Sequence, residues 1–468
     1  MSISSAFNIA RSGLSTTEGR ANLVAGNIAN AQTEGYARRE AVQVTENNSV
    51  DLRVARQVDE NLAGMSRGAS AQLGAASVTS EVLGSYLLTL GEPGDEVSPA
   101  ARLAEFQAGL DLLANNPSDP AAQNDLLSRS ETLVSSINQA AVALEASRVQ
   151  AGDSFVLGVS EVNGALADIA QLNERLRLAG TDGTGTAGLM DEMNRRLDAL
   201  GSQMDFQSRW ESDGSLTLHT TGGTELVHGD TAVKLSANRE TGALMAGTID
   251  ITPRSATARG SDSGRLAGLS GLIAGDLPKM KLQLDEFARG LVQSFEAADA
   301  SLGAGQPGLF TDAGGAFDAA QLDGLAGRLS INSSVQPDKG GALWRLRDGA
   351  GAATQGEPGD TTQLNAFVDV LETGLTFDAA TGLSTTARLG DFAADMVSHQ
   401  NVLRVGADAQ AETARVRLVT FEDNRSSIEG VNVDTELQKL LEIEQAYGAN
   451  SQVLSSLSDM LDTLLASV

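Results

Sequence analysis

Two short segments and three histidines are the first places to look for chemistry in this sequence. The segment "GDSF", Gly152 to Phe155, offers a serine that could act as a nucleophile. Such a serine needs a histidine base, which a carboxylate orients. The only histidines are His219, His228 and His399, and none follows an aspartate in an Asp-x-x-His arrangement. We therefore predict no catalytic residues and no enzymatic activity.

The second segment, "GTGTAG", has glycines in the spacing of a dinucleotide-binding loop. They are Gly183, Gly185 and Gly188. Such a loop must follow a strand, so that the pyrophosphate meets the N-terminus of the next helix. The residues before it, "LNERLRLAG", are typical of a helix. We predict a flexible connection between two helices and no cofactor. The scattered histidines also lack metal-ligand spacing, so we predict no metal.

A third segment, "NIANAQTEGYARRE" from Asn27 to Glu40, has the features of a structural joint. Asn27 and Asn30 lie three residues apart on one helix face, where amides can bond neighbouring backbone groups. Gly35 is placed to end the helix in the left-handed conformation. Tyr36 follows as an aromatic anchor, and Arg38 lies on the strand that emerges. We expect a joint between a helix and a β-hairpin.

Composition limits the class of protein further. The chain of 468 residues has a net charge of -28, so it lacks the basic surface that binds nucleic acid. It contains no cysteine, which excludes disulfides and thiolate chemistry. No run of about 18 apolar residues predicts a membrane span. The N-terminus lacks a basic region followed by an apolar stretch, so we expect no cleaved signal peptide.

Both ends of the chain show the heptad pattern of a coiled coil, with apolar residues three and four apart. The first seam contains Ile3, Phe7, Ala10, Leu14, Thr17, Ala21, Val24, Ile28 and Ala31. The last contains Leu440, Ile443, Tyr447, Asn450, Leu454, Leu457, Leu461, Leu464 and Val468. A lone polar residue such as Asn450 can fix the register of a seam. The two helices can pair with each other, with other copies, or with the body of an ordinary helical bundle.

Between the ends, the periodicity changes several times. We expect a β-hairpin at 36–58, with Asn48 in its turn, and then a helix over 58–90. Ser98 before Pro99 marks the start of a further helix. Helices are expected at about 121–151, 155–179, 189–204, 271–302 and 388–428. Period-two alternation predicts strands over 205–253, with a hairpin at Asp213-Gly214. Residues 303–385 are glycine-rich and read as mainly β or irregular.

These elements predict a mainly α fold with β-rich insertions. A long helical bundle forms the body, terminal coiled-coil helices bracket it, and one or two β-rich modules lie outside. The predicted inner domain combines 1–35 with 431–468. The body combines 36–204, 265–302 and 386–430, with a β-rich insertion at 205–264 and the outer module at 303–385.

The joint segment also resembles the N-terminal signature of bacterial flagellar axial proteins, the family of rod, hook and hook-associated proteins. That signature reads Asn-x-Ala-Asn, two residues, Thr-x-Gly-Tyr/Phe-x-Arg. The matching positions are Asn27, Ala29, Asn30, Thr33, Gly35, Tyr36 and Arg38. The stretch "GVNVDTELQKLLEIEQAYGANSQVLSSLSDMLDTLL" is similar to the C-terminal signature of the family. The interior, from "LAEFQAGLDLLANNPSDP" onward, resembles the helical region of a hook-associated member. "TAGLMDEMNRRLDAL" departs from the family pattern and keeps its charges only partly.

The resemblance implies a structural subunit at the junction between hook and filament, needed for filament assembly and motility. Its terminal helices would line the inner tube and become ordered on assembly. Implied partners are further copies in a ring or short helical zone, the hook protein, a second junction protein, and an export chaperone on the C-terminal helix. The chain would be exported through the flagellar type III apparatus and be extracellular. Residues 27–38 of the signature and the C-terminal seam are the expected assembly residues, with Tyr36 and Arg38 bracing the joint against the C-terminal helix.

Two other functions remain open from the sequence. Another axial protein, such as hook, distal rod or a divergent flagellin, would share parts of the terminal pattern. Hook and rod proteins are expected to have a mainly β interior, which disagrees with the long helical region at 98–200. An enzyme has no supporting constellation among the residues.

Overall fold

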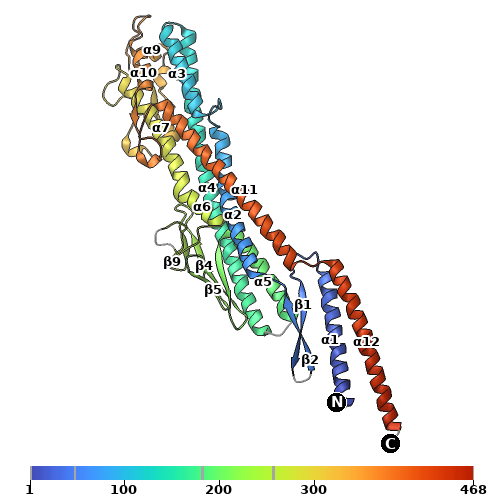
Figure 1. Ribbon diagram of the computed structural model, residues 1–468. Helices are drawn as coiled ribbons and strands as arrows, with labels where there is room; N and C mark the ends of the chain where they lie inside the picture. Colours follow the sequence, from blue (N-terminus) through green and yellow to red (C-terminus); the bar gives the residue numbers. More distant parts are fainter. Residues whose placement is uncertain (1–2, 47–48, 181–183, 256–258, 467–468) are drawn as a thin grey trace.

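The computed structural model describes residues 3–46, 49–180, 184–255 and 259–466. The molecule is elongated, with a helical body, short mixed elements at one end and two terminal helices projecting from the other (Figure 1). Small sheets lie on one side of the body. This arrangement confirms the predicted fold class, a mainly α protein with β-rich insertions and paired terminal helices.

The body is a bundle of long helices with shorter ones packed against them. Its helices are α2 (Glu60–Leu90), α3 (Pro99–Asn115), α4 (Pro120–Ala179), α5 (Thr184–Gln203), α6 (Arg265–Gly271), α7 (Leu277–Ala298) and α11 (Leu389–Glu429). A π-helical turn, Leu272–Asp276, joins α6 to α7. The start of α3 is as predicted: the Ser98 hydroxyl accepts from the Ala101 amide, and Pro99 occupies the first turn.

Helix α4 runs without a break from Pro120 to Ala179, so the prediction of two helices divided at 152–154 was wrong. Gly152 is a packing position inside this helix. A Cβ atom on it would lie 2.9 Å from the backbone oxygen of Arg239. The glycine therefore allows the chain from the β-rich insertion to lie directly on α4.

The prediction of a flexible, glycine-rich connection before α5 was also wrong for two of its three glycines. Gly185 and Gly188 belong to the first turns of α5, which begins at Thr184, rather than to a flexible loop. Gly183 lies outside the described residues. Helix α6 likewise begins at Arg265, earlier than the helix expected from 271.

Two small antiparallel sheets form the insertion after α5, where period two predicted strands. The first contains β3 (Phe206–Trp210), β4 (Leu216–Thr220), β5 (Glu225–His228) and β6 (Thr231–Ala232). The second contains β7 (Leu235–Ala237), β8 (Leu244–Ala246) and β9 (Ile249–Asp250). Gly214 has φ 84° in the tight connection between β3 and β4, as the Asp213-Gly214 signal predicted.

Residues 303–385 form the mixed end of the body. Two short hairpins pair β10 (Phe310–Asp312) with β11 (Leu329–Ile331), and β12 (Leu375–Thr376) with β13 (Thr386–Ala387). Helices α8 (Leu325–Arg328), α9 (Arg345–Asp348) and α10 (Thr362–Glu372) lie between them. The prediction of a mainly β or irregular segment missed α10, whose buried Leu364, Phe367 and Leu371 are spaced as one helical face. The proposed domain borders stay a prediction.

Helix α2 is central to the body, packed against α11, α4, α5 and α6. Among the described helices it alone is long and apolar enough to cross a membrane by composition, with a mean hydropathy of 1.2. Its apolar face is used inside the protein, since Val78, Leu83, Tyr86 and Leu90 are buried. The length and composition of α2 are therefore explained by its place in the core.

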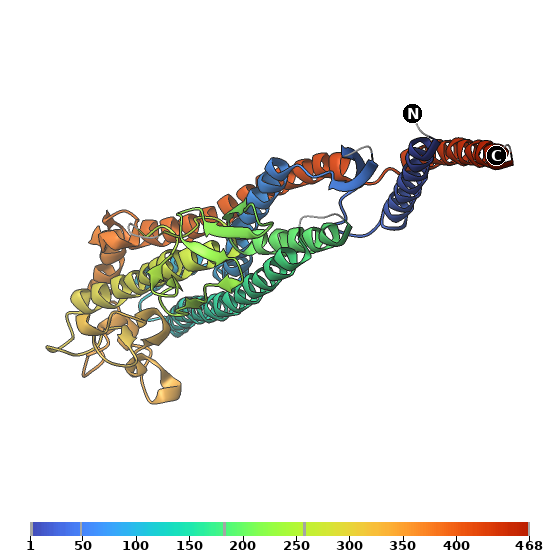
Figure 2. The ribbon, with the colours of Figure 1, turned by 90° about the horizontal axis from the view of Figure 1, so that it is seen from below.

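At the other end, α1 (Ile3–Ala29) and α12 (Val433–Ala466) lie side by side (Figure 1). The hairpin of β1 (Arg39–Glu46) and β2 (Ser49–Arg56) follows α1, with Arg39 opposite Arg56 and Glu46 opposite Ser49. It confirms the expected hairpin, although Asn48 lies outside the described residues. Figure 2 shows the pair of terminal helices standing apart from the body.

Candidate assembly site at the joint of the terminal helices

The joint begins where α1 ends at Ala29 and the chain turns back toward the hairpin. Gly35 adopts φ 74°, the left-handed conformation predicted for it. A Cβ atom on Gly35 would lie 2.5 Å from Cγ of Arg195 on α5, so a side chain is excluded by space as well as by backbone conformation. The Nη1 atom of Arg195 donates to the Glu34 carbonyl at 3.2 Å.

Asn27 is the centre of the joint and is only 1% exposed. Its Nδ2 group donates to the carbonyl of Arg39 and to Oε2 of Glu436, both at 2.9 Å. Its Oδ1 atom accepts from the Tyr36 hydroxyl at 2.8 Å and from the Arg39 amide at 3.0 Å. One side chain thus uses both donors and both acceptor positions of its amide. It links α1, the start of β1 and the first turn of α12.

The partner on α12, Glu436, is fully buried. Lys439, one turn further along α12, donates to its second oxygen at 2.7 Å. A buried carboxylate without partners would cost several kcal/mol, whereas here both oxygens are bonded. Glu436 was not among the predicted site residues. Glu436 lies six residues after Gly430, which follows the end of α11. It therefore belongs to the first turn of the C-terminal helix, where an acidic residue is common.

Tyr36 reaches α12 through Asn27 rather than directly. The Arg39 guanidinium lies over its ring, 4.8 Å from the centroid. Burial raises the pKa of the Tyr36 hydroxyl above its ordinary value. The hydroxyl therefore stays protonated and serves as the donor to Asn27.

The other predicted residues of the signature lie at the surface of the joint. The Arg38 amide donates to the Glu429 carbonyl at 2.8 Å, at the end of α11, while its guanidinium lies 3.2 Å from Glu40. Asn30 donates to the Gly26 carbonyl at 2.8 Å, and Thr33 donates to Asn30 at 3.3 Å. These contacts shape the turn after α1.

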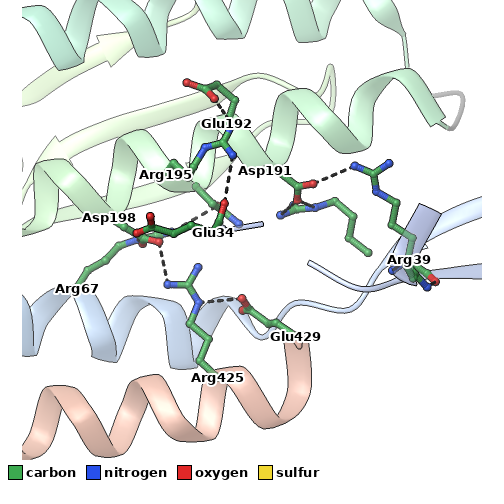
Figure 3. A network of polar contacts seen from close by, with 12 residues as sticks. Glu34, Arg39, Arg67, Asp191, Glu192, Arg195, Asp198, Arg425 and Glu429 are labelled. Atoms are coloured by element: carbon green, nitrogen blue, oxygen red, sulfur yellow. Dashed lines mark hydrogen bonds and ion pairs between the residues drawn. The ribbon is translucent and has the colours of Figure 1, made fainter. Parts of the chain in front are cut away.

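A second group of charges fastens the joint to the body, as Figure 3 shows. Asp191 of α5 is 4% exposed and accepts from Arg39 at 3.0 Å and from Arg56 at 2.9 Å, one from each strand of the hairpin. Asp198, two turns along the same helix, accepts from Arg67 at 2.7 Å and from Arg425 at 2.9 Å. Helix α5 therefore connects the hairpin, α2 and α11.

Arg425 also donates to Glu429 at 2.9 Å, one turn further along α11. Burial opposes the charge of Arg425, yet Asp198 and Glu429 keep its pKa above the ordinary value. Burial raises the pKa of Glu429, against the opposing effect of Arg425. The cluster of charges is therefore partly desolvated, which makes its geometry matter more than that of a surface ion pair.

These α5 residues were not among the predicted site residues, because the segment departs from the family pattern. A signal was nevertheless present. Asp191, Arg195 and Asp198 are four and three residues apart, so they share one helix face. Only the structure shows that this face meets the joint.

The predicted C-terminal seam is partly closed by α1. Ile443 is buried, and Leu440, Asn450, Leu454 and Leu457 are half-buried. Asn450 donates to the Thr17 hydroxyl at 3.4 Å, so the polar members of the two seams meet. Tyr447 is 47% exposed and Leu461 38% exposed. The side chains of Ile3 and Leu464, and residue Val468, lie outside the described residues.

No group of three or more His, Cys, Asp or Glu residues that could hold a metal occurs in the described ranges. The joint contains amide, carboxylate and guanidinium groups that bond one another. Its geometry is that of a mechanical connection between a pair of helices and a body.

Comparison with known proteins agrees with this geometry. Residues 89–315 match the model of the flagellar hook-associated protein FlgK helical domain, and residues 424–467 match that of the flagellar basal body rod FlgEFG protein C-terminal region. The second match covers α12, and the first covers α3 to α7. Together they define an axial protein of the bacterial flagellum.

Relatives along the whole chain narrow the class. Flagellar hook-associated protein 1 of Salmonella typhimurium is 23% identical, over 99% of this chain and 100% of the relative. The protein of the same name in Escherichia coli is also 23% identical over the same shares, and that of Bacillus subtilis is 20% identical over 97% and 96%. Along its whole length the chain is therefore similar to the FlgK family of flagellar hook-associated proteins. The flagellar hook junction protein FlgK of Burkholderia pseudomallei is a similar solved structure, with 21% identity and a TM-score of 0.43 over 53% of this chain and 46% of that one.

Proposed function

We propose that this chain is a structural subunit of the hook–filament junction, needed for filament assembly on the hook and for motility, and that it has no catalytic activity. The observation that carries the proposal is the bond between Asn27 and Glu436. It joins the N-terminal signature to the first turn of the C-terminal helix, 409 residues away. The two ends thereby form one module, held at a fixed place on the body.

Helix α12 exposes large apolar side chains on several of its sides. They are Leu437, Leu441, Val453, Met460 and Leu465, between 46% and 73% exposed. Exposed apolar side chains on a helix that stands apart from the body favour an interaction surface. We assign it to other copies of this chain in a ring or short helical zone. The residues of the joint and the C-terminal seam are the proposed assembly residues.

The remaining partners follow from the proposed place in the flagellum. The hook protein lies on one side of the zone and a second junction protein on the other. A chaperone covers the apolar α12 before export, and the chain leaves the cell through the flagellar export apparatus without a cleaved signal peptide. The inner domain of residues 1–35 and 431–468 forms the tube, with the body outside it.

Electron microscopy of cells that carry a clean deletion of the gene tests the proposal. We expect hooks without filaments, flagellin shed into the medium, and recovery when the intact gene is supplied on a plasmid. Missing hooks would instead place the chain in the rod or the hook. Filaments of normal length and number would show that the chain is not needed at the junction.

A further inference from the structure

Two exposed surfaces on the body have no partner among the residues that the structure describes. The first is a ridge on α4, formed by Val142, Ala146, Val149, Val156 and Leu157. The first four are spaced by four, three and seven residues, as in a coiled-coil seam. They point away from the core face of α4, which contains Leu144, Ala151 and Phe155. Val142 is 68% exposed and Leu157 62% exposed, so the ridge projects into solvent.

The second surface is a groove of about 890 Å³ between α2, α6 and α11. Small side chains line it, among them Ala75 and Ala76 from α2 and Gly406, Ala409 and Thr413 from α11. Small residues let another helix approach closely, and the gaps between them accept branched side chains. Val402, 64% exposed, stands at its rim.

The ridge and the groove have the same length and the same height on the body. Residues 142–157 and 402–417 each span about 22 Å of helix. At one end of both surfaces, two adjacent residues show that α4 and α11 are at the same height. Leu277 lines a cleft together with Leu144 of α4. Its neighbour Asp276 lines the groove together with Val402 of α11. At the other end, Leu266 lies against Gly158, while its neighbour Ala267 lines the groove with Thr413.

The two surfaces also lie on different sides of the molecule. Figure 2 shows the red-orange α11 along one side of the body and the teal α4 along the other. Helix α2 packs against both. In Figure 1 both helices run from the mixed end toward the joint, so they are parallel. Rotation about an axis parallel to these helices keeps their direction from copy to copy, and a head-to-tail contact between different surfaces generates rings or helices.

Charged side chains at the joint end of the two surfaces fit one register of α4 against α11. Arg417, at the joint end of the groove, donates to Gln72 at 3.4 Å and has no ion pair with a carboxylate among the described residues. Pairing residue 142 with residue 402 brings Arg417 level with Leu157, one turn from the exposed Glu161. An ion pair there would fix the register of the contact, in a groove that is also lined by the charged Arg254, Asp262 and Asp276.

We propose that the α4 ridge of one copy packs into the groove between α2 and α11 of the next copy, so that the bodies form a second ring of contacts outside the terminal helices. This contact rests on the proposed function, because it requires many parallel copies around one axis. It is separate from the exposed apolar side chains of α12 and uses none of the joint residues. The occupant of the groove is therefore a second copy of this chain.

Disulfide trapping tests the contact cleanly, since the chain has no cysteine of its own. The double variant Val149→Cys/Ala409→Cys is expressed in place of the wild type, and isolated hook–filament particles are oxidised with copper phenanthroline. The same oxidation is applied to the purified full-length chain at high concentration. We expect a ladder of dimers, trimers and longer oligomers on non-reducing gels, and its loss on reduction.

Controls separate this contact from chance collision. A mixture of the two single variants can form dimers only, because each chain then carries one cysteine. Leu178→Cys with Ala409→Cys keeps an exposed cysteine on α4 but moves it off the ridge, and we expect at least tenfold less cross-linking. Helical circular dichroism confirms that each variant is folded.

The two proposals fail in different ways. Particles that contain the double variant at the wild-type level but yield only monomer would overturn the ridge–groove contact and leave the junction role standing. A chain that is absent from the particles even as wild type would overturn the junction role. The oxidised, purified double variant then tests the ridge–groove contact on its own. A ladder of oligomers on the non-reducing gel would support the contact, and monomer alone would refute it.

Discussion

At the scale of single residues, Asn27 has the most constrained position in the joint. An amide is the side chain that can donate twice and accept twice from one buried point. Aspartate at this position would lose both donors and place a second carboxylate beside Glu436. Glutamine would carry the amide one bond too far for the same four partners. The residue type is therefore set by hydrogen-bond chemistry, more than by size.

We predict that Asn27→Leu disables assembly without unfolding the body. The change leaves the Tyr36 hydroxyl, the Arg39 amide and one oxygen of buried Glu436 without partners. Each buried unpaired group costs about 1–3 kcal/mol, and 1.4 kcal/mol is tenfold in an equilibrium. The amount of the variant in isolated hook–filament particles should fall at least tenfold, as measured by quantitative immunoblotting.

Asn115→Leu at the end of α3 is the matched control, because its amide donates to the Asp111 carbonyl one turn earlier, at an exposed position outside the joint. It should retain most of the incorporation. Thermal melting of the body should be the same in both variants and the wild type. Normal incorporation of Asn27→Leu would show that the hydrogen-bond centre does not hold the joint.

At the scale of elements, α4 joins the parts of the body. It contacts α2, α3, α5, α6 and α7, and parts of the insertion and of the mixed end. Its glycines have different surroundings along the same helix. Gly152 lies against the backbone of Arg239, whereas nothing lies within 4 Å of the Cβ position of Gly164. Substitutions at these two glycines therefore separate the effect of helix propensity on stability from the effect of packing.

We predict opposite signs for alanine at these two glycines. Gly164→Ala should raise the free energy of unfolding by up to about 1 kcal/mol, because alanine favours the helix and meets no neighbour. Gly152→Ala should lower it by about 1–3 kcal/mol, since a backbone oxygen must move to accept the methyl group. Urea unfolding followed by circular dichroism measures both. Stabilisation by Gly152→Ala would mean that the insertion does not rest closely on α4.

At the scale of the whole molecule, the net charge of -28 and the buried carboxyl groups act in the same direction. Burial raises the pKa of five carboxyl groups in the described body and joint, namely Asp205, Asp276, Asp285, Glu296 and Glu429. A folded state with raised carboxyl pKa values binds protons more tightly than the unfolded chain. Stability from these groups therefore increases as the pH falls toward their folded values and is lost as the pH rises through them.

We predict that the melting temperature of the body rises when the pH is lowered from 7 to about 5. Self-repulsion between acidic groups falls over the same range. Calorimetry in low salt and in about 1 M salt separates the causes, because salt screens the surface charges and leaves the buried groups largely unaffected. A melting temperature that falls between pH 7 and 5 in both salts would contradict the prediction.

The local features of this protein could be predicted from residue type and spacing alone. The seams, the hairpin, the left-handed Gly35 and the start of α3 at Ser98 all depend on the conformations of neighbouring residues. Those preferences act over a few residues and can be read from spacing and residue type. The family signatures also belong to this level, because they are continuous segments of the chain.

Where those segments meet could not be predicted, because it depends on contacts across the whole fold. That Asn27 bonds Glu436, and that one face of α5 holds the hairpin, depends on residues that are far apart in the chain. The same is true of Gly152, which lies inside the uninterrupted helix α4 and packs against Arg239. Glycine has a weak helix propensity wherever it stands, so its role here is set by what packs against it. Burial and partners across the fold decided these roles, and no local pattern contains them.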